Sequence, residues 1–299
     1  MRHGIATLCA LAFTVAGVAA CARESKPAVK ELRVPDGDVT LHVRIAGDAN
    51  APAVLVALHG GPGNSSDYMV SLEQLAGPQL AVVTYDQRGT GRSSKPSEGY
   101  SMPRYIADVE AVRQAAGAER FHLLGHSWGG VLALRYAAAY PERVSSIILM
   151  GSGVLTPEAS QAAQASKALR IQALRDQGVI PQTIQSLEDL LPAYFSNPHF
   201  EMPDELKGMY YDPVVEQETW ETLQDYDFGA ELDALDQPIL ILWGEDDPFG
   251  LAYVEATRRA LSGATLEVVM LDSCGHYWHE CPDPFFAQVR AFLETAAAQ

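Results

Sequence analysis

The segment Gly125-His126-Ser127-Trp128-Gly129 constrains the fold of this chain more than any other stretch of its sequence. A short apolar run at 120–124 precedes it, and a run rich in helix-forming residues follows at 131–140. This order predicts a strand, a sharp turn and a helix, with the serine in a strained backbone at the turn. Gly125 and Gly129 would leave room for the close approach of strand and helix. The Ser127 hydroxyl then projects above the sheet, beside the free N–H groups of the helix amino terminus. The plainer interpretation is a glycine-rich turn with a passive serine.

Patterns of buried strands and of helices alternate along most of the chain. Continuous apolar runs, typical of strands buried on both faces, lie at 52–58, 80–85, 144–150, 238–243 and 265–271. Helices are expected at 105–116, 253–261 and 285–295. The alternating stretch 31–47 carries a turn signature at 35–38 and is expected to form an antiparallel hairpin. The whole pattern predicts an α/β fold, with a mostly parallel sheet and helices on both faces.

The alternation stops between residues 155 and 230. This block has no buried-strand pattern, is helical in tendency and is interrupted by prolines. We interpret it as a helical cap inserted over the carboxyl ends of the strands, where α/β sheets bind their ligands. The core of the domain would then consist of residues 31–154 and 231–299.

A serine that acts as a nucleophile needs a base and an orienting acid. In this architecture both follow it along the chain, in the order serine, acid, histidine. The acid is expected after a late strand, where Asp247 directly precedes a proline and Asp246 is the alternative. The base is expected after the last strand, where His276 fits; its rival His279 would fall at the start of the final helix. His126, next to the serine, is expected to pack rather than to act as the base.

An attacked carbonyl oxygen becomes negatively charged and needs backbone N–H donors from two places. One is the residue after the serine, Trp128, and the other lies in the loop after an early strand. The segment His59-Gly60-Gly61-Pro62-Gly63 follows such a strand, and Gly61 is the candidate donor. Losing one such donor costs about 3 kcal/mol of transition-state stabilisation. A plain tight turn would not explain two successive glycines and a proline at the end of a strand.

Two cysteines flank the candidate base. Together, Cys274, His276, His279 and Cys281 could suggest a metal site, but the gaps between them do not match the usual zinc spacings. We therefore expect no metal. A Cys274–Cys281 disulfide that braces this loop is the favoured interpretation, provided that the Cα separation permits it.

The amino-terminal residues have the features of an export signal. Arg2 provides a basic start, and 5–18 is apolar and too short for a lasting membrane span. The end of this segment, Val18-Ala19-Ala20-Cys21, resembles the lipobox of bacterial lipoproteins. That resemblance implies removal of residues 1–20, a lipid on Cys21 and, with Ala22 next to it, the outer membrane. Residues 21–30 would be a tether, and a soluble periplasmic protein is the alternative.

The formal net charge of -17 restricts the partners of this chain. Binding to nucleic acid needs basic patches, so nucleic acid is not expected as a partner. Electrostatic docking on anionic lipid is not expected either, and contact with a membrane would run only through the amino-terminal lipid. The oligomeric state is not predicted.

Three segments together resemble the prolyl iminopeptidase family of serine peptidases: 59–63, 125–130 and Asp86-Gln87-Arg88-Gly89-Thr90-Gly91-Arg92-Ser93. The resemblance implies an α/β-hydrolase fold with no metal or organic cofactor. It also implies removal of an amino-terminal residue, often proline, from small peptides. The triad would be Ser127, Asp247 and His276, with Gly61 and Trp128 as oxyanion donors.

In that family, cap carboxylates bind the substrate's amino group. Residues 155–230 contain thirteen Asp or Glu and four Lys or Arg, so carboxylates are available. Trp220-Glu221 is similar to a Trp-Glu pair of the family, which makes Glu218 and Glu221 candidates. A carboxylesterase or lactonase on the same fold, and a non-enzymatic binding protein, are the alternatives. Relatives with an aspartate nucleophile are excluded because position 127 is serine.

Overall fold

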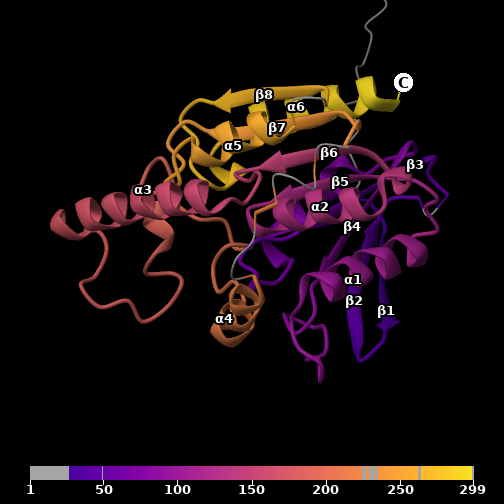
Figure 1. Ribbon diagram of the computed structural model, residues 1–299, viewed down its shortest axis with the longest axis horizontal. Coiled ribbons are helices and arrows are strands. Elements are labelled where there is room, and N and C mark those ends of the chain that lie inside the picture. Colours follow the sequence, from indigo (N-terminus) through magenta and orange to yellow (C-terminus); the bar gives the residue numbers. More distant parts are fainter. Residues whose placement is uncertain are drawn as a thin grey trace, which may run out of the picture.

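A single eight-stranded sheet organises the molecule (Figure 1). The computed structural model describes residues 27–48, 50–223, 227–228, 232, 235–261 and 264–297. The predicted signal segment 1–20, Cys21 and most of the predicted tether lie outside the described residues. Within the described part, no helix is long and apolar enough to cross a membrane.

The strand order is β1-β2-β4-β3-β5-β6-β7-β8. The strands are β1 (Val29–Asp36), β2 (Val39–Ala46), β3 (Ala53–Leu58), β4 (Leu80–Asp86), β5 (Phe121–His126), β6 (Val144–Met150), β7 (Ile239–Gly244) and β8 (Leu266–Leu271). From β4 to β8 every neighbouring pair is parallel. The predicted α/β fold with a mostly parallel sheet is therefore confirmed.

The predicted hairpin forms the antiparallel edge of this sheet. Asp36 pairs with Val39 across a turn in which Gly37 has a φ of 56°, a conformation that glycine adopts without strain. β1 begins at Val29, because Val29 pairs with Ala46 at the open end of the hairpin. The strand therefore starts two residues inside the expected tether.

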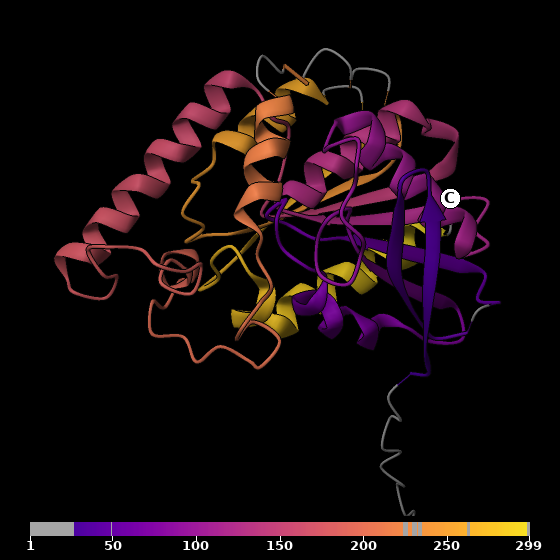
Figure 2. The same ribbon diagram turned by 90° about the horizontal axis from the view of Figure 1, so that it is seen from below.

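Helices cover both faces of the sheet. They are α1 (Met102–Ala115), α2 (Trp128–Ala139), α5 (Ala252–Ala260) and α6 (Pro282–Ala297), with a 3₁₀ helix, η1 (Asp67–Leu75), after β3. The apolar cluster on one face contains side chains of α1, α2 and α5. The cluster on the other face contains side chains of η1 and α6, which Figure 2 shows on the side opposite α1 and α2.

The block between β6 and β7 stands beside the carboxyl ends of the parallel strands (Figure 1). It contains α3 (Pro157–Asp176), a short 3₁₀ helix η3 (Leu191–Tyr194) and α4 (Pro213–Thr222), joined by long loops. Each α-helix begins at a proline, whose missing N–H costs nothing there. The side chains of Thr156 and Asp212 accept hydrogen bonds from the first free amides of α3 and α4.

Candidate active site

Ser127 occupies the sharp turn between β5 and α2, with φ 53° and ψ -121°. A non-glycine residue with such a φ is held there by its surroundings. The turn is this tight because glycines flank it. A Cβ on Gly125 would lie 2.3 Å from the Cα of Gly130, and one on Gly129 would lie 2.0 Å from the Leu58 carbonyl oxygen. The predicted role of these two glycines is confirmed.

Asp247 and His276 meet at the carboxyl ends of β7 and β8. The His276 Nδ1 donates to Asp247 Oδ2 at 2.7 Å, and the other carboxylate oxygen accepts from the Phe249 amide at 2.9 Å. Both side chains are at most 3% exposed. Because Nδ1 is the donor to Asp247, the remaining ring nitrogen of His276, Nε2, is the one available as a base.

The two rival residues have other partners. Asp246 accepts a hydrogen bond from the Ser196 hydroxyl of the cap at 2.6 Å. The His279 Nε2 lies 3.0 Å from the Tyr68 carbonyl oxygen and 3.1 Å from Glu205 Oε1. Of the candidate acids and bases, only Asp247 and His276 are hydrogen-bonded to each other within the described part of the chain.

Ser127 and His276 line the same cavity, which has a volume of about 910 Å³. The cavity lies between the sheet and the cap, and residues of α3, α4 and the loops between them form its far wall. No hydrogen bond among the described residues engages the Ser127 hydroxyl. Nucleophile–base hydrogen bonds are often loose without substrate and tighten when it binds.

The two candidate oxyanion donors flank the serine. Trp128 is the first residue of α2, and Gly61 has a φ of 95° in the loop after β3. This loop approaches the serine closely, since a Cβ on Gly60 would lie 3.0 Å from the Ser127 Cβ. Within the described residues, neither the Gly61 nor the Trp128 amide donates a hydrogen bond, so both remain available to a ligand.

A glutamine from the loop after β4 connects the loop that contains Gly61 to the Trp128 side chain. The Gln87 side chain donates to the His59 carbonyl at 2.8 Å and accepts from the Trp128 indole N–H at 2.9 Å. The Gln87 amide also donates to His59 Nε2 at 3.0 Å. The sequence pattern does not reveal these bonds, because they join residues 28 and 41 positions apart.

A family model described as the alpha/beta hydrolase fold matches residues 53–280. A proline iminopeptidase of Lactobacillus delbrueckii subsp. lactis is 31% identical over 280 residues, which cover 83% of this chain and 92% of the relative. The chain belongs to the α/β-hydrolase family, in its prolyl iminopeptidase-like branch.

Other relatives of this hydrolase agree. A proline iminopeptidase of Lactobacillus helveticus (strain DPC 4571) is 29% identical over 290 residues, covering 88% of this chain and 97% of the relative. The crystal structure of a proline iminopeptidase from Mycobacterium smegmatis superposes with a TM-score of 0.69 at 24% identity. It covers 90% of this chain and 100% of that protein, and it shows the shared fold.

The cap of this hydrolase turns a different carboxylate to the cavity from those expected. Glu216 and Trp220, four residues apart on α4, both line it. Glu218 and Glu221 are exposed to solvent and do not line it. The helical period explains the difference, because residues four apart share a face and residues two or five from Glu216 do not. Glu216 therefore replaces them as the candidate, and its spacing from Trp220 was the available signal.

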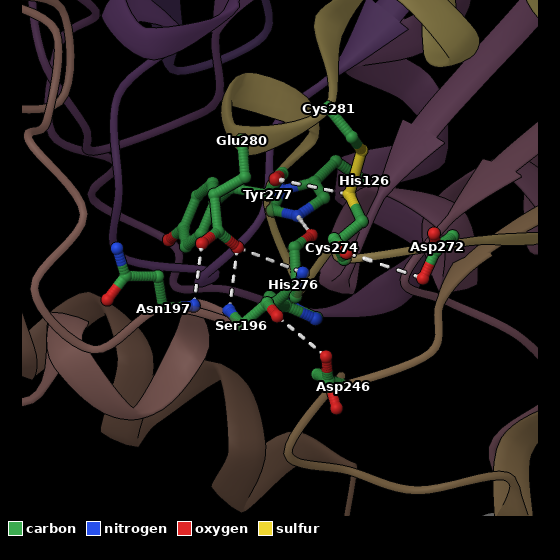
Figure 3. The surroundings of a disulfide bond; sticks show 12 residues. His126, Ser196, Asn197, Asp246, Asp272, Cys274, His276, Tyr277, Glu280 and Cys281 are labelled. Carbon is green, nitrogen blue, oxygen red and sulfur yellow. Dashed lines mark hydrogen bonds between the residues drawn. A yellow bond between two sulfur atoms is a disulfide. The ribbon is translucent and has the colours of Figure 1, made fainter.

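The loop that carries His276 is fastened to both the core and the cap (Figure 3). Cys274 and Cys281 form a disulfide with a Cα–Cα distance of 5.6 Å. The Glu280 carboxylate accepts three amide hydrogen bonds, from Ser196, Asn197 and Gly275, at 2.7–3.0 Å. One carboxylate thus joins the cap segment after η3 to the residue preceding the candidate base.

Proposed function

We propose that this hydrolase is a serine aminopeptidase that removes amino-terminal residues, proline among them, from small peptides through an acyl-enzyme. The observation that carries the proposal is the Asp247–His276 hydrogen bond, which faces the same cavity as the strained Ser127. The relatives named proline iminopeptidase support the peptide substrate.

In the proposed reaction, His276 Nε2 takes the proton of Ser127 while the serine oxygen bonds to the carbonyl carbon of the first residue. The Gly61 and Trp128 amides stabilise the resulting oxyanion. His276 then gives its proton to the leaving amine as the carbon–nitrogen bond breaks. Water attacks the acyl-enzyme, His276 accepts its proton, and the first amino acid leaves as the serine regains a proton.

The preference for a free amino group rests on the cavity carboxylates. Glu216 and Glu188 both line the cavity and come from the cap, opposite the serine. An ammonium group that enters this space is attracted to them, and the attraction is stronger in a partly enclosed site than in water. The Trp220 ring lies edge-on to Trp128, 5.6 Å between centroids, which places an apolar wall beside the acyl group.

The test compares the purified protein with its Ser127→Ala variant on two substrate sets. One set contains amino-acid arylamides with free amino groups, led by proline, and the other contains short acyl esters and lactones. We expect amide cleavage, lost when the amino group is blocked, with kcat/KM at least about 10⁴-fold lower in Ser127→Ala. The variant should unfold at the same temperature as the parent.

Each other outcome contradicts part of the proposal. Cleavage of esters or lactones alone would assign a carboxylesterase or lactonase. Amide cleavage that survives Ser127→Ala would reject the nucleophile. No turnover on either set would favour a binding protein.

A further inference from the structure

The cavity contains a lysine that the proposed chemistry leaves unused. Among the described residues that line the cavity, Lys167 of α3 is the only lysine or arginine. The carboxylates that share the cavity with it are Glu188 and Glu216. A lysine ammonium that has no partner within the protein is free to form a charge-assisted hydrogen bond with an anionic group of a ligand.

No carboxylate of the described residues lies within ion-pair distance of the Lys167 ammonium. Glu188 instead accepts from the Gly208 amide at 2.9 Å, and Glu216 accepts from the Tyr211 hydroxyl. The Lys167 ammonium lies over the Phe249 ring, 5.0 Å from its centroid. Burial lowers the pKa of Lys167, and the charge of Glu216 opposes that shift. The ammonium is therefore partly desolvated and has no carboxylate partner among the described residues.

The position of this ammonium identifies the part of a substrate that it faces. The Phe249 ring below it also contacts His276, with 5.0 Å between ring centroids. The Lys167 ammonium thus lies within about 10 Å of the imidazole, on the Phe249 side. In the proposed mechanism the imidazole protonates the leaving amine, so the leaving residue lies beside the imidazole. In a dipeptide, the carboxylate is separated from that amine by a single Cα.

We propose that Lys167 binds the α-carboxylate of the leaving residue, so that the preferred substrates are dipeptides with a free carboxyl terminus. This inference rests on the proposed aminopeptidase function and names its substrate class. Longer peptides and carboxyl-terminal amides have a neutral amide at the same place and lose the ion pair. A charge-assisted hydrogen bond of this kind corresponds to about 10- to 100-fold in affinity.

Binding is measured by calorimetry in the Ser127→Ala background, where peptides are not consumed. The probes are X-Ala dipeptides and the matched X-Ala amides, with proline, alanine or leucine as X. We expect the free acid to bind at least about 10-fold more tightly than the amide. Adding Lys167→Gln should weaken binding of the free acid but not of the amide, so that the ratio of their affinities comes near one. Lys167→Arg should retain part of the preference for the acid. The control is Lys207→Gln, an exposed cap lysine paired with Asp204, which should leave the ratio unchanged.

The results separate this inference from the proposed function. The role of Lys167 is overturned if the free acid and the amide bind with similar affinity, or if Lys167→Gln does not change the ratio of the two affinities. Failure of both peptides to bind also overturns it. Cleavage of the amino-acid arylamides by the parent enzyme tests the aminopeptidase alone, since those substrates have no carboxylate. Turnover of arylamides together with equal affinities for the free acid and the amide would therefore reject only the dipeptide preference.

Discussion

At the scale of single residues, the buried hydroxyl of Tyr68 and the His126 ring together link the Gly60 loop to the His276 loop. The Gly60 amide donates to Tyr68 Oη at 2.6 Å, and Tyr68 Oη lies 2.7 Å from His126 Nδ1. The His126 Nε2 is 3.0 Å from the carbonyl oxygen of His276. A carbonyl only accepts, so Nε2 carries the proton and Nδ1 accepts from Tyr68. Burial lowers the pKa of His126 well below its usual value, which keeps this neutral tautomer.

Tyr68→Phe should lower both activity and stability. It leaves the Gly60 amide and His126 Nδ1 without partners in a buried place, which costs about 1–3 kcal/mol for each unsatisfied group. We expect kcat to fall while KM changes little, because the oxyanion loop and the His276 loop lose a shared contact. Steady-state kinetics on a proline arylamide and urea unfolding measure the two effects.

The matched control is Tyr85→Phe. Tyr85 is also fully buried, and its hydroxyl has no hydrogen-bond partner among the described residues. Its removal should leave kcat unchanged and the free energy of unfolding equal or higher. Equal losses in both variants would show that the Tyr68 hydroxyl contributes only packing.

The residues of the candidate triad could be predicted, but this network could not. Ser127, Asp247 and His276 each follow a strand in the order that the architecture requires, so local pattern was sufficient. Tyr68 lies 58 positions before His126 and belongs to no motif. Its role depends on how η1 packs under the sheet, which the sequence pattern does not contain.

At the scale of elements, the segment from Cys274 to Cys281 holds the candidate base. The disulfide closes a short loop, and the segment between its cysteines contains both His276 and Glu280 (Figure 3). Such a crosslink removes conformations mainly from the unfolded chain. It also limits how far His276 can move away from Asp247.

Replacing both cysteines by serine should lower the free energy of unfolding by about 2–3 kcal/mol, as expected for a loop of this length. We expect a several-fold loss of kcat as well, because the loop loses a constraint next to its hydrogen bonds with the cap. Urea unfolding and arylamide kinetics measure both quantities. Treating the parent protein with a reductant should reproduce the loss, and unchanged stability in both preparations would contradict a stabilising role.

Elements of the core were more predictable than those of the cap. Continuous apolar runs located the parallel strands, and the structure has β6 at the expected residues, Val144–Met150. The cap lacks such runs, and its polar helices expose most of their surface. Which side chains of α4 face the cavity depends on how the helix is docked, and this is why Glu216 was missed.

At the scale of the whole molecule, buried histidines make stability depend on pH. His59, His122 and His126 are at most 6% exposed, and burial lowers the pKa of each. For His122 the pKa falls from 6.5 to about 4. Between these pKa values the unfolded chain binds protons that the folded state does not bind. The free energy of unfolding therefore decreases as pH falls from about 6.5 towards 4.

His122→Gln should reduce this pH dependence. The shift of His122 corresponds to about 3 kcal/mol of stability lost in acid, and glutamine does not titrate. The Nδ1 of His122 lies 2.8 Å from the Ser146 hydroxyl, and a glutamine amide can satisfy the same hydroxyl. We expect the free energy of unfolding to fall less between pH 7 and pH 4.5 in the variant than in the parent.

The control for this prediction is His199→Gln, since His199 is exposed on the cap. His199 is exposed and makes no buried hydrogen bond with the described residues, so its replacement should leave the pH dependence of the parent intact. Comparing the two variants also removes the contribution of the many carboxylates, which titrate alike in both. The same slope in His122→Gln as in His199→Gln would mean that His122 takes up its proton without loss of stability. The contribution of buried histidines to acid sensitivity would then come from His59, in the loop after β3, and from His126, next to Ser127.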